Sequence, residues 1–122
     1  MIELCKVVAE YGGSLVVHQR SESGHILDSM REIIRVGRES GVHIHFSHFK
    51  ICGKENWKYM EPALHLLDEA EAEGIQVSLD QYPYTAGSTM LGVILPPWAH
   101  DGGTEKLLER LTDKNCRERL KA

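Results

Sequence analysis

Two short motifs hold the residues best suited to metal chemistry, His18-x-Arg20 and His48-x-Lys50. Each places an imidazole two positions before a cation, and each follows a short β-prone run. Imidazole is a common zinc ligand, and a cation beside it could hold a carboxylate of a substrate. The alternative is that His18 and His48 are ordinary polar residues of loops. The metal hypothesis requires the chain to bring the two motifs together.

A pattern that recurs three times along the sequence provides a way to do so. The runs GGSLVVHQR, GVHIHFSHFK and GIQVSLDQYPY each begin with glycine, continue through β-prone residues and end in polar or aromatic ones. Between these runs, apolar residues recur at three- and four-residue steps at 26–37 and 63–70, which is typical of amphipathic helices. Residues 2–11 show the same periodicity and predict a further helix.

The expected order of elements is therefore α-β-α-β-α-β. A strand, a crossover helix and a second strand of this length form a parallel unit, so the predicted fold class is α/β with about three parallel βα units. Gly41 and Gly74 are expected at helix C-termini, and Pro62 in the first turn of its helix. Because the carboxyl ends of parallel strands meet at one edge of a sheet, the two motifs and Asp80 are expected there.

The pattern changes in the last third of the chain. Residues 85–103 are rich in glycine and proline and predict a lid-like loop, and the remainder predicts one helix or two short ones, with Thr104 and Asp113 as N-caps. We expect a single domain over 1–122, with βα units at 1–84. Three strands are too few for a closed (β/α)8 barrel of about 250 residues. The chain is thus a small open α/β domain or a partial TIM barrel, whose free edges would favour association.

Composition narrows the class of protein. The net charge is −4 and the basic residues are dispersed, which argues against a nucleic-acid partner. No apolar run approaches the roughly 18 residues of a membrane span, and Glu3 and Lys6 do not fit a secretory signal. Cys5, Cys52 and Cys116 fit neither a disulfide framework nor a Cys-x-x-Cys metal site. We therefore expect a cytoplasmic protein, with Cys52 as a buried free thiol.

Four segments together resemble one known family. HQRSE (18–22), SHFKICGKENW (47–57), DQYPYTAGST (80–89) and LPPWAHDGG (95–103) are similar to the D-aminoacylase, or N-acyl-D-amino-acid deacylase, branch of the amidohydrolase superfamily. The last two segments are the specific ones. The resemblance implies a (β/α)8 barrel, of which this chain is an interior fragment around strands five to seven. It also implies zinc-dependent hydrolysis of the amide bond of N-acyl-D-amino acids by the complete enzyme. With two histidine ligands only, this chain alone is expected to bind zinc weakly or to hold none.

The resemblance assigns roles residue by residue. It implies that His18 and His48 are metal ligands, that Lys50 lies in the substrate site, and that Tyr82 or Tyr84 lines the substrate pocket, with the choice between the tyrosines open. Arg20 is a further candidate for substrate binding; the alternative is an ion pair with Glu22 or with a neighbouring loop.

The histidines at 43–45 are not assigned to the metal. Strict alternation along a strand would put His43 and His45 on one face, and His48 on the opposite face with Phe46. We expect the alternation to break at Ser47–His48, so that His48 turns toward the metal. His45 is then a hydrogen-bonded histidine facing the barrel interior, and Asp80 a carboxylate that orients a loop. The remaining histidines, His25, His65 and His100, are expected at the surface.

Several parts of the family's active site have no counterpart in this sequence. They are the His-x-His pair of the first strand, a cysteine ligand and the aspartate base of the eighth strand. We therefore assign no catalytic residue and expect the chain alone to be inactive. Its expected partners are an N-acyl-D-amino acid in the complete enzyme, and a second copy or a complementary barrel fragment. Two alternatives are a non-catalytic, self-associating α/β module and a fragment of a dihydroorotase-like cyclic amidohydrolase.

Overall fold

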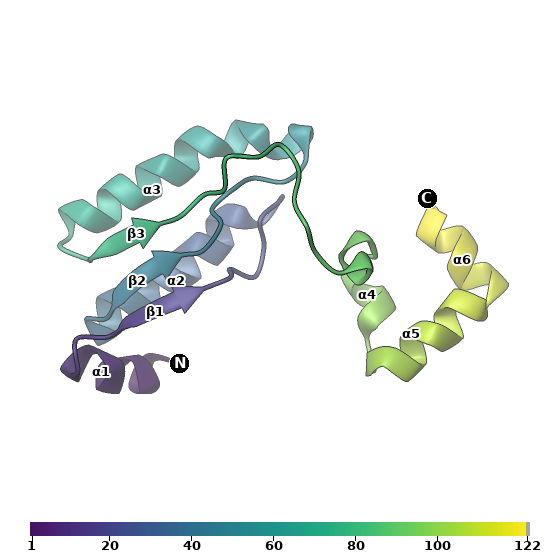
Figure 1. Cartoon of the computed structure of the whole chain (residues 1–122), viewed down its shortest axis with the longest axis horizontal. Helices are drawn as coiled ribbons and strands as arrows, with labels where there is room; N and C mark the ends of the chain where they lie inside the picture. The colour runs from purple at the N-terminus through teal and green to yellow at the C-terminus, as the bar shows by residue number, and fades with distance from the viewer. Residues whose placement is uncertain (122) are drawn as a thin grey trace. The chain divides into compact units, whose positions relative to one another are not determined.

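The computed structural model describes residues 1–121 and divides into two compact units, Met1–Pro83 and a second that begins at Tyr84. The first unit carries a parallel sheet in the order β1-β2-β3 (Figure 1). Its elements follow the predicted order: α1 (Ile2–Glu10), β1 (Ser14–Val17), α2 (Ile26–Ser40), β2 (His43–Phe46), η1 (Lys54–Tyr59), α3 (Met60–Ala72) and β3 (Val77–Leu79). The α/β class and the three parallel βα units are confirmed.

The register of the sheet separates an apolar face from a polar one. On the helix-covered face, Ile44 and Phe46 of β2 are almost fully buried, and they belong to one core with residues of α2 and α3: Met30, Ile33, Ile34, Ala63, Leu67 and Ala70. The opposite face, here called the open face, is made by Ser14, Val16, His43, His45 and Ser78, which are exposed or half-buried. Burial on one side thus fixes which side chains point to the other.

Gly37 lets α2 lie close to the sheet, and Gly41 ends that helix. A Cβ on Gly37 would lie 3.0 Å from Cγ2 of Ile75 and 3.1 Å from Cγ2 of Ile44, so a larger residue would push the helix off the sheet. Gly41 ends α2 in the left-handed conformation with φ of 72°, as predicted. Pro62 is the third residue of α3, where no intrahelical donor is lost, which also agrees with the prediction.

The second unit is helical. It contains η2 (Leu91–Ile94), α4 (Pro97–His100), α5 (Gly103–Thr112) and α6 (Lys114–Lys121). Asp113 caps α6 as predicted, because its Oδ1 accepts a hydrogen bond from the Cys116 amide at 2.7 Å. Thr104 was wrongly predicted as a cap, because Gly102 precedes the first helical residue of α5. Along the described chain, no helix combines the length and apolar character that crossing a bilayer requires.

Candidate metal centre

The two motifs meet where β1 and β2 end. His18 directly follows β1, and His48 follows β2 by two residues. His48 has φ of 43°, the one positive value among non-glycine residues of the described chain. This left-handed turn breaks the alternation of the strand, as the sequence predicted, and swings the imidazole toward His18. The edge of a parallel sheet therefore brings together two rings that lie 30 positions apart in the chain.

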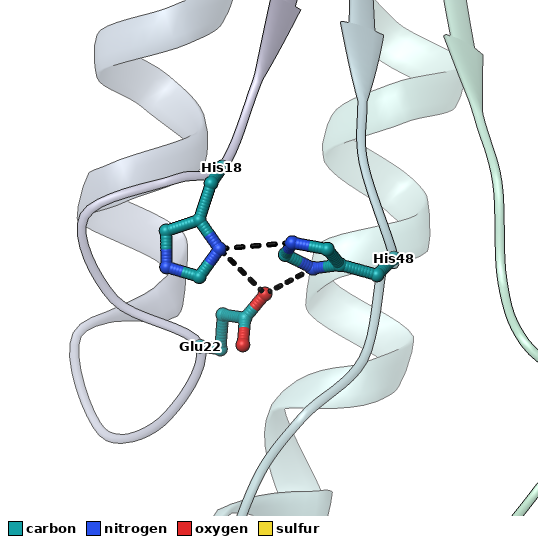
Figure 2. A group of neighbouring side chains, drawn as sticks. All are labelled: His18, Glu22 and His48. Atoms are coloured by element: carbon teal, nitrogen blue, oxygen red, sulfur yellow. Dashed lines mark hydrogen bonds and ion pairs between the residues drawn. The ribbon is translucent and has the colours of Figure 1, made fainter. Parts of the chain in front are cut away.

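The two imidazoles, here called the histidine pair, point their nitrogens at each other. His18 Nδ1 lies 2.9 Å from His48 Nε2, and the ring centroids are 4.7 Å apart (Figure 2). Zinc–nitrogen bonds of about 2.0–2.1 Å place two tetrahedral ligands about 3.3 Å apart. A small opening of the pair would therefore admit an ion between these two nitrogens.

Glu22 completes a group of three possible ligands that sequence reasoning missed. Its Oε1 lies 2.8 Å from His48 Nδ1 and 3.9 Å from His18 Nδ1. The side chain is only 13% exposed, and Oε1 is buried without an aligned hydrogen-bond donor. The candidate ligand atoms of His18, Glu22 and His48 all lie within 4.8 Å of one another (Figure 2). A buried carboxylate oxygen that lacks a donor and faces two imidazoles fits a cation site, since such an oxygen needs a compensating charge.

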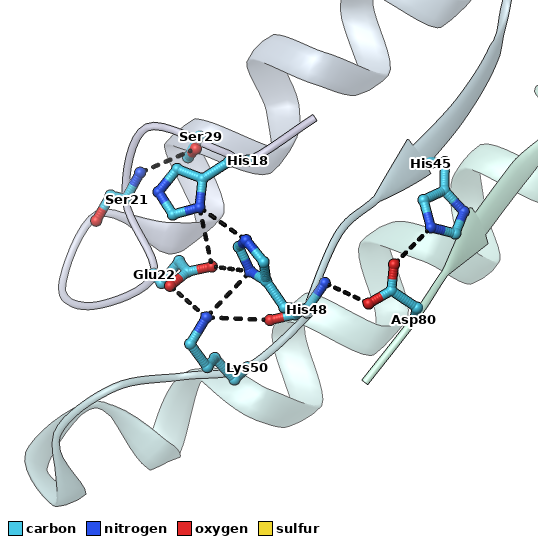
Figure 3. Close-up of polar contacts among 8 residues, drawn as sticks. All are labelled: His18, Ser21, Glu22, Ser29, His45, His48, Lys50 and Asp80. Atoms are coloured by element: carbon cyan, nitrogen blue, oxygen red, sulfur yellow. Dashed lines mark hydrogen bonds and ion pairs between the residues drawn. The ribbon is translucent and has the colours of Figure 1, made fainter. Parts of the chain in front are cut away.

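Lys50 lies against the same carboxylate. Its Nζ is 2.5 Å from Glu22 Oε2, and 3.1 Å from both Nδ1 and the carbonyl oxygen of His48 (Figure 3). The ammonium group also lies 5.7 Å from the centre of the Tyr82 ring, within the range of a cation–π contact. The structure therefore groups Lys50 and Tyr82 with the histidine pair, and each oxygen of Glu22 has a different neighbour.

Asp80 fixes the turn that presents His48. Its Oδ1 accepts a hydrogen bond from the His48 backbone amide at 2.8 Å, and its Oδ2 lies 2.8 Å from His45 Nε2 (Figure 3). The hydrogen bond from His45, followed by that from the His48 amide, lowers the pKa of Asp80 below its ordinary value. Asp80 thus has the loop-orienting contact expected from the sequence. Both of its oxygens are engaged, which leaves neither free to act as a base.

Arg20, Tyr84, Cys52 and three further histidines complete the set of predicted residues. Arg20 is exposed and its Nε donates to Glu32 of α2 at 2.7 Å, so its ion pair is with a neighbouring element rather than with Glu22. Tyr84 is the first residue of the second unit and is 75% exposed. Cys52 is free but exposed, so its predicted burial is wrong: its amide donates to the Glu22 carbonyl and the two loops pair at the surface. His25, His65 and His100 are exposed as expected, and His18 is exposed as well.

The comparisons with known proteins define first a class and then a family. No family model matches the chain. A solved structure described as D-aminoacylase that "defines a novel subset of amidohydrolases" superposes with a TM-score of 0.68 at 43% identity, over 74% of this chain and 19% of that one. A second, N-acyl-D-glutamate deacylase from Bordetella bronchiseptica with zinc and a phosphonate inhibitor, gives 0.71 at 30% identity, over 83% and 20%. The chain is thus a partial α/β barrel of the amidohydrolase class.

Curated sequences narrow the class to one family. D-aminoacylase of Alcaligenes xylosoxydans xylosoxydans is 42% identical over 91 residues, which are 75% of this chain and 19% of the relative. N-acyl-D-glutamate deacylase of the same organism is 35% identical over 88 residues, 72% of this chain and 18% of the relative. The predicted resemblance is confirmed: this chain belongs with the D-aminoacylase and N-acyl-D-amino-acid deacylase family. It spans about a fifth of the length of the curated relatives that it matches.

Proposed function

We propose that this chain forms part of a zinc-dependent deacylase that hydrolyses the amide bond of N-acyl-D-amino acids. The observation that carries the proposal is the histidine pair, with nitrogens 2.9 Å apart at the carboxyl edge of a parallel sheet and a buried carboxylate beside them. Relatives support it by name: one solved D-aminoacylase is described by its binuclear metal centre, and an N-acyl-D-glutamate deacylase by its complex with zinc.

In this proposal His18 and His48 hold the metal. When bound, zinc supplies a Lewis acid that polarises the amide carbonyl and activates water. His48 offers Nε2 to the ion, while its Nδ1 lies 2.8 Å from Glu22 Oε1 and 3.1 Å from Lys50 Nζ. His18 offers Nδ1 from the neighbouring strand end. Glu22 Oε1 supplies negative charge at the same point, which partly offsets the charge of the ion.

Lys50 is the proposed anchor of the substrate carboxylate. Its side chain is 25% exposed and its ammonium lies beside the histidine pair, so an anion that binds it lies close to the ion as well. Glu22 holds the lysine in place before substrate arrives. Tyr82 lies next to Lys50 and is the proposed pocket tyrosine. Arg20 pairs with Glu32 of α2 and has no substrate role in this proposal. Asp80 is not the base, and we assign no catalytic residue within this chain.

The metal ligands are tested by zinc titration calorimetry of the purified chain and of single variants. We expect His18→Ala and His48→Ala each to weaken zinc binding by tenfold or more. His65→Ala is the matched control, because His65 is exposed on α3 next to Glu69 and outside the site. Equal affinity in all four proteins would contradict the assignment of the histidine pair.

The substrate class is tested by NMR titration of the zinc-loaded chain with an N-acetyl-D-amino acid and with its L enantiomer. We expect the D form to shift the signals of Lys50 and Tyr82 more strongly than the L form. We expect no turnover by the chain alone, since it offers no base. Zinc-dependent hydrolysis that His48→Ala abolishes would overturn that expectation, and equal response to both enantiomers would argue against a D-specific site.

A further inference from the structure

A continuous series of hydrogen bonds crosses the open face of the sheet. Ser14 Oγ lies 3.0 Å from His43 Nδ1, and His43 Nε2 lies 2.8 Å from Ser78 Oγ. The same Ser78 Oγ lies 2.8 Å from His45 Nδ1, and His45 Nε2 lies 2.8 Å from Asp80 Oδ2. The series therefore connects all three strands. Figure 3 shows its end, where His45 meets the Asp80 carboxylate that holds the His48 amide.

The chemistry of the groups fixes one direction for the whole series. An ionised carboxylate only accepts, so His45 must donate from Nε2 to Asp80 and, as a neutral ring, accept at Nδ1. Ser78 then donates its single hydroxyl proton to His45 Nδ1, so it must accept a hydrogen bond from His43 Nε2. His43 is left with a bare Nδ1, which accepts from Ser14. With neutral rings every donor points toward Asp80, and both histidines carry their proton on Nε2.

We propose that His45 and His43 are positioning residues, which act through Ser78 and Asp80 to hold the metal ligand His48 in its left-handed turn. The inference rests on the proposed role of His48 in binding zinc. The turn is unfavourable for a residue with a side chain, so it needs an outside contact to persist. Asp80 provides that contact. The Nε2–H of His45 donates to the other oxygen of the carboxylate and so holds it in the orientation that reaches the His48 amide.

The direction of the series makes a sharp prediction for one substitution. In Asp80→Asn the amide oxygen can still accept from the His48 amide, while the new NH₂ group faces His45 and can only donate. His45 must then accept at Nε2 and donate from Nδ1 to Ser78. Ser78 in turn donates to His43 Nε2, and His43 donates from Nδ1 to Ser14. One isosteric change at the end of the series should reverse both histidines.

The test is long-range proton–nitrogen NMR of the histidine rings in the metal-free chain at about pH 8, above the pKa of about 6.5 of a histidine in a model peptide. We expect His43 and His45 to carry the proton on Nε2 in the native chain and on Nδ1 in Asp80→Asn. In Ser78→Ala with Asp80→Asn, His45 should still reverse, but His43 should no longer follow it. A native His45 protonated on Nδ1, or a His43 that reverses without Ser78, would overturn the proposed series.

Zinc affinity tests the link to His48. Asp80→Ala removes the acceptor for the His48 amide and should weaken zinc binding tenfold or more, whereas Asp80→Asn should restore most of it. Equal affinity in Asp80→Ala and the native chain would show that His48 needs no positioning. The histidine tautomers are measured without metal, so they test the hydrogen-bond series even if the chain does not bind zinc. A failure to bind zinc would contradict the proposed function but not the series.

Discussion

Glu22 and Lys50 form an ion pair that joins the proposed substrate anchor to the proposed metal ligands. Lys50 Nζ lies 2.5 Å from Oε2, while Oε1 of the same carboxylate faces the histidine pair. One half-buried acid thus neutralises a lysine and adds negative charge at the proposed cation position. Loss of the lysine and loss of the acid should consequently change metal binding in opposite directions.

Removal of the Glu22 charge should weaken zinc binding. We expect Glu22→Gln to lower the affinity by about 10- to 100-fold, because a carboxylate that contacts both a ligand imidazole and the ion site is replaced by a neutral amide. The measurement is calorimetric titration with zinc. Glu32→Gln is the matched control, since Glu32 pairs with Arg20 on the exposed side of α2. An unchanged affinity in Glu22→Gln would limit the site to the two histidines.

Removal of the Lys50 charge should strengthen zinc binding and weaken substrate binding. Lys50→Met takes away a positive charge that stands beside the ion and competes for Glu22, so we expect zinc affinity to rise by a few-fold. Binding of an N-acetyl-D-amino acid should fall in the same variant. Lys54→Met, at the exposed start of η1, should change neither. A fall in both affinities would mean that Lys50 holds the loops together rather than the substrate.

The free energy of unfolding should depend far more on side chains of the helix-covered face of the sheet than on those of the open face. Ile44→Val removes one methylene from a fully buried side chain and should reduce the free energy of unfolding by about 1 kcal/mol. Val16→Ala is the control on the open face, where 64% exposure predicts a change within about 0.5 kcal/mol. Urea denaturation followed by circular dichroism gives both values. Similar losses would show that another chain or segment covers the open face.

The hydrogen bond by which Asp113 caps α6 should be lost in acid. The hydrogen bond from the Cys116 amide, followed by the thiol contact, lowers the pKa of Asp113 below its ordinary value of 3.8. The stabilisation is therefore complete above that ordinary value and is lost as the pH falls through the lower folded value. The Cys116 amide shift, followed by NMR from neutral pH into acid, should report this step. Asp113→Asn retains an acceptor and should abolish the step; an identical acid profile in that variant would assign it to another group.

Self-association is expected because both outer strands of the described sheet lack a partner on one side. In the order β1-β2-β3, strands β1 and β3 have free edges, and Leu79 on β3 is 41% exposed. We predict a homo-oligomer, most simply a two-fold dimer, in sedimentation equilibrium. Leu79→Lys should shift the equilibrium toward monomer. A single native species of 13.8 kDa at micromolar concentration would exclude edge pairing.

Local sequence patterns were sufficient to predict the helices and strands of the first unit and the approach of His18 to His48. Gly41 marks its helix end, and the strand runs place His18 and His48 at one edge because parallel strands share their direction. Glu22 escaped detection because its role depends on how the loop after β1 folds back over the strand ends. That fold is set by contacts far apart in sequence, such as the pairing of the Cys52 amide with the Glu22 carbonyl. The same pairing explains why Cys52 lies at the surface.

The three candidate donors all lie within residues 18–48: His18 and His48 follow the strands joined by α2, and Glu22 lies in the loop after β1. A single stretch of coding sequence therefore specifies all three of these donors, so gene fusion or exchange between barrels would transfer them together. A graft of this segment onto another parallel α/β host would also have to supply the Asp80 acceptor for the His48 amide and the Cys52 amide that pairs with the Glu22 loop.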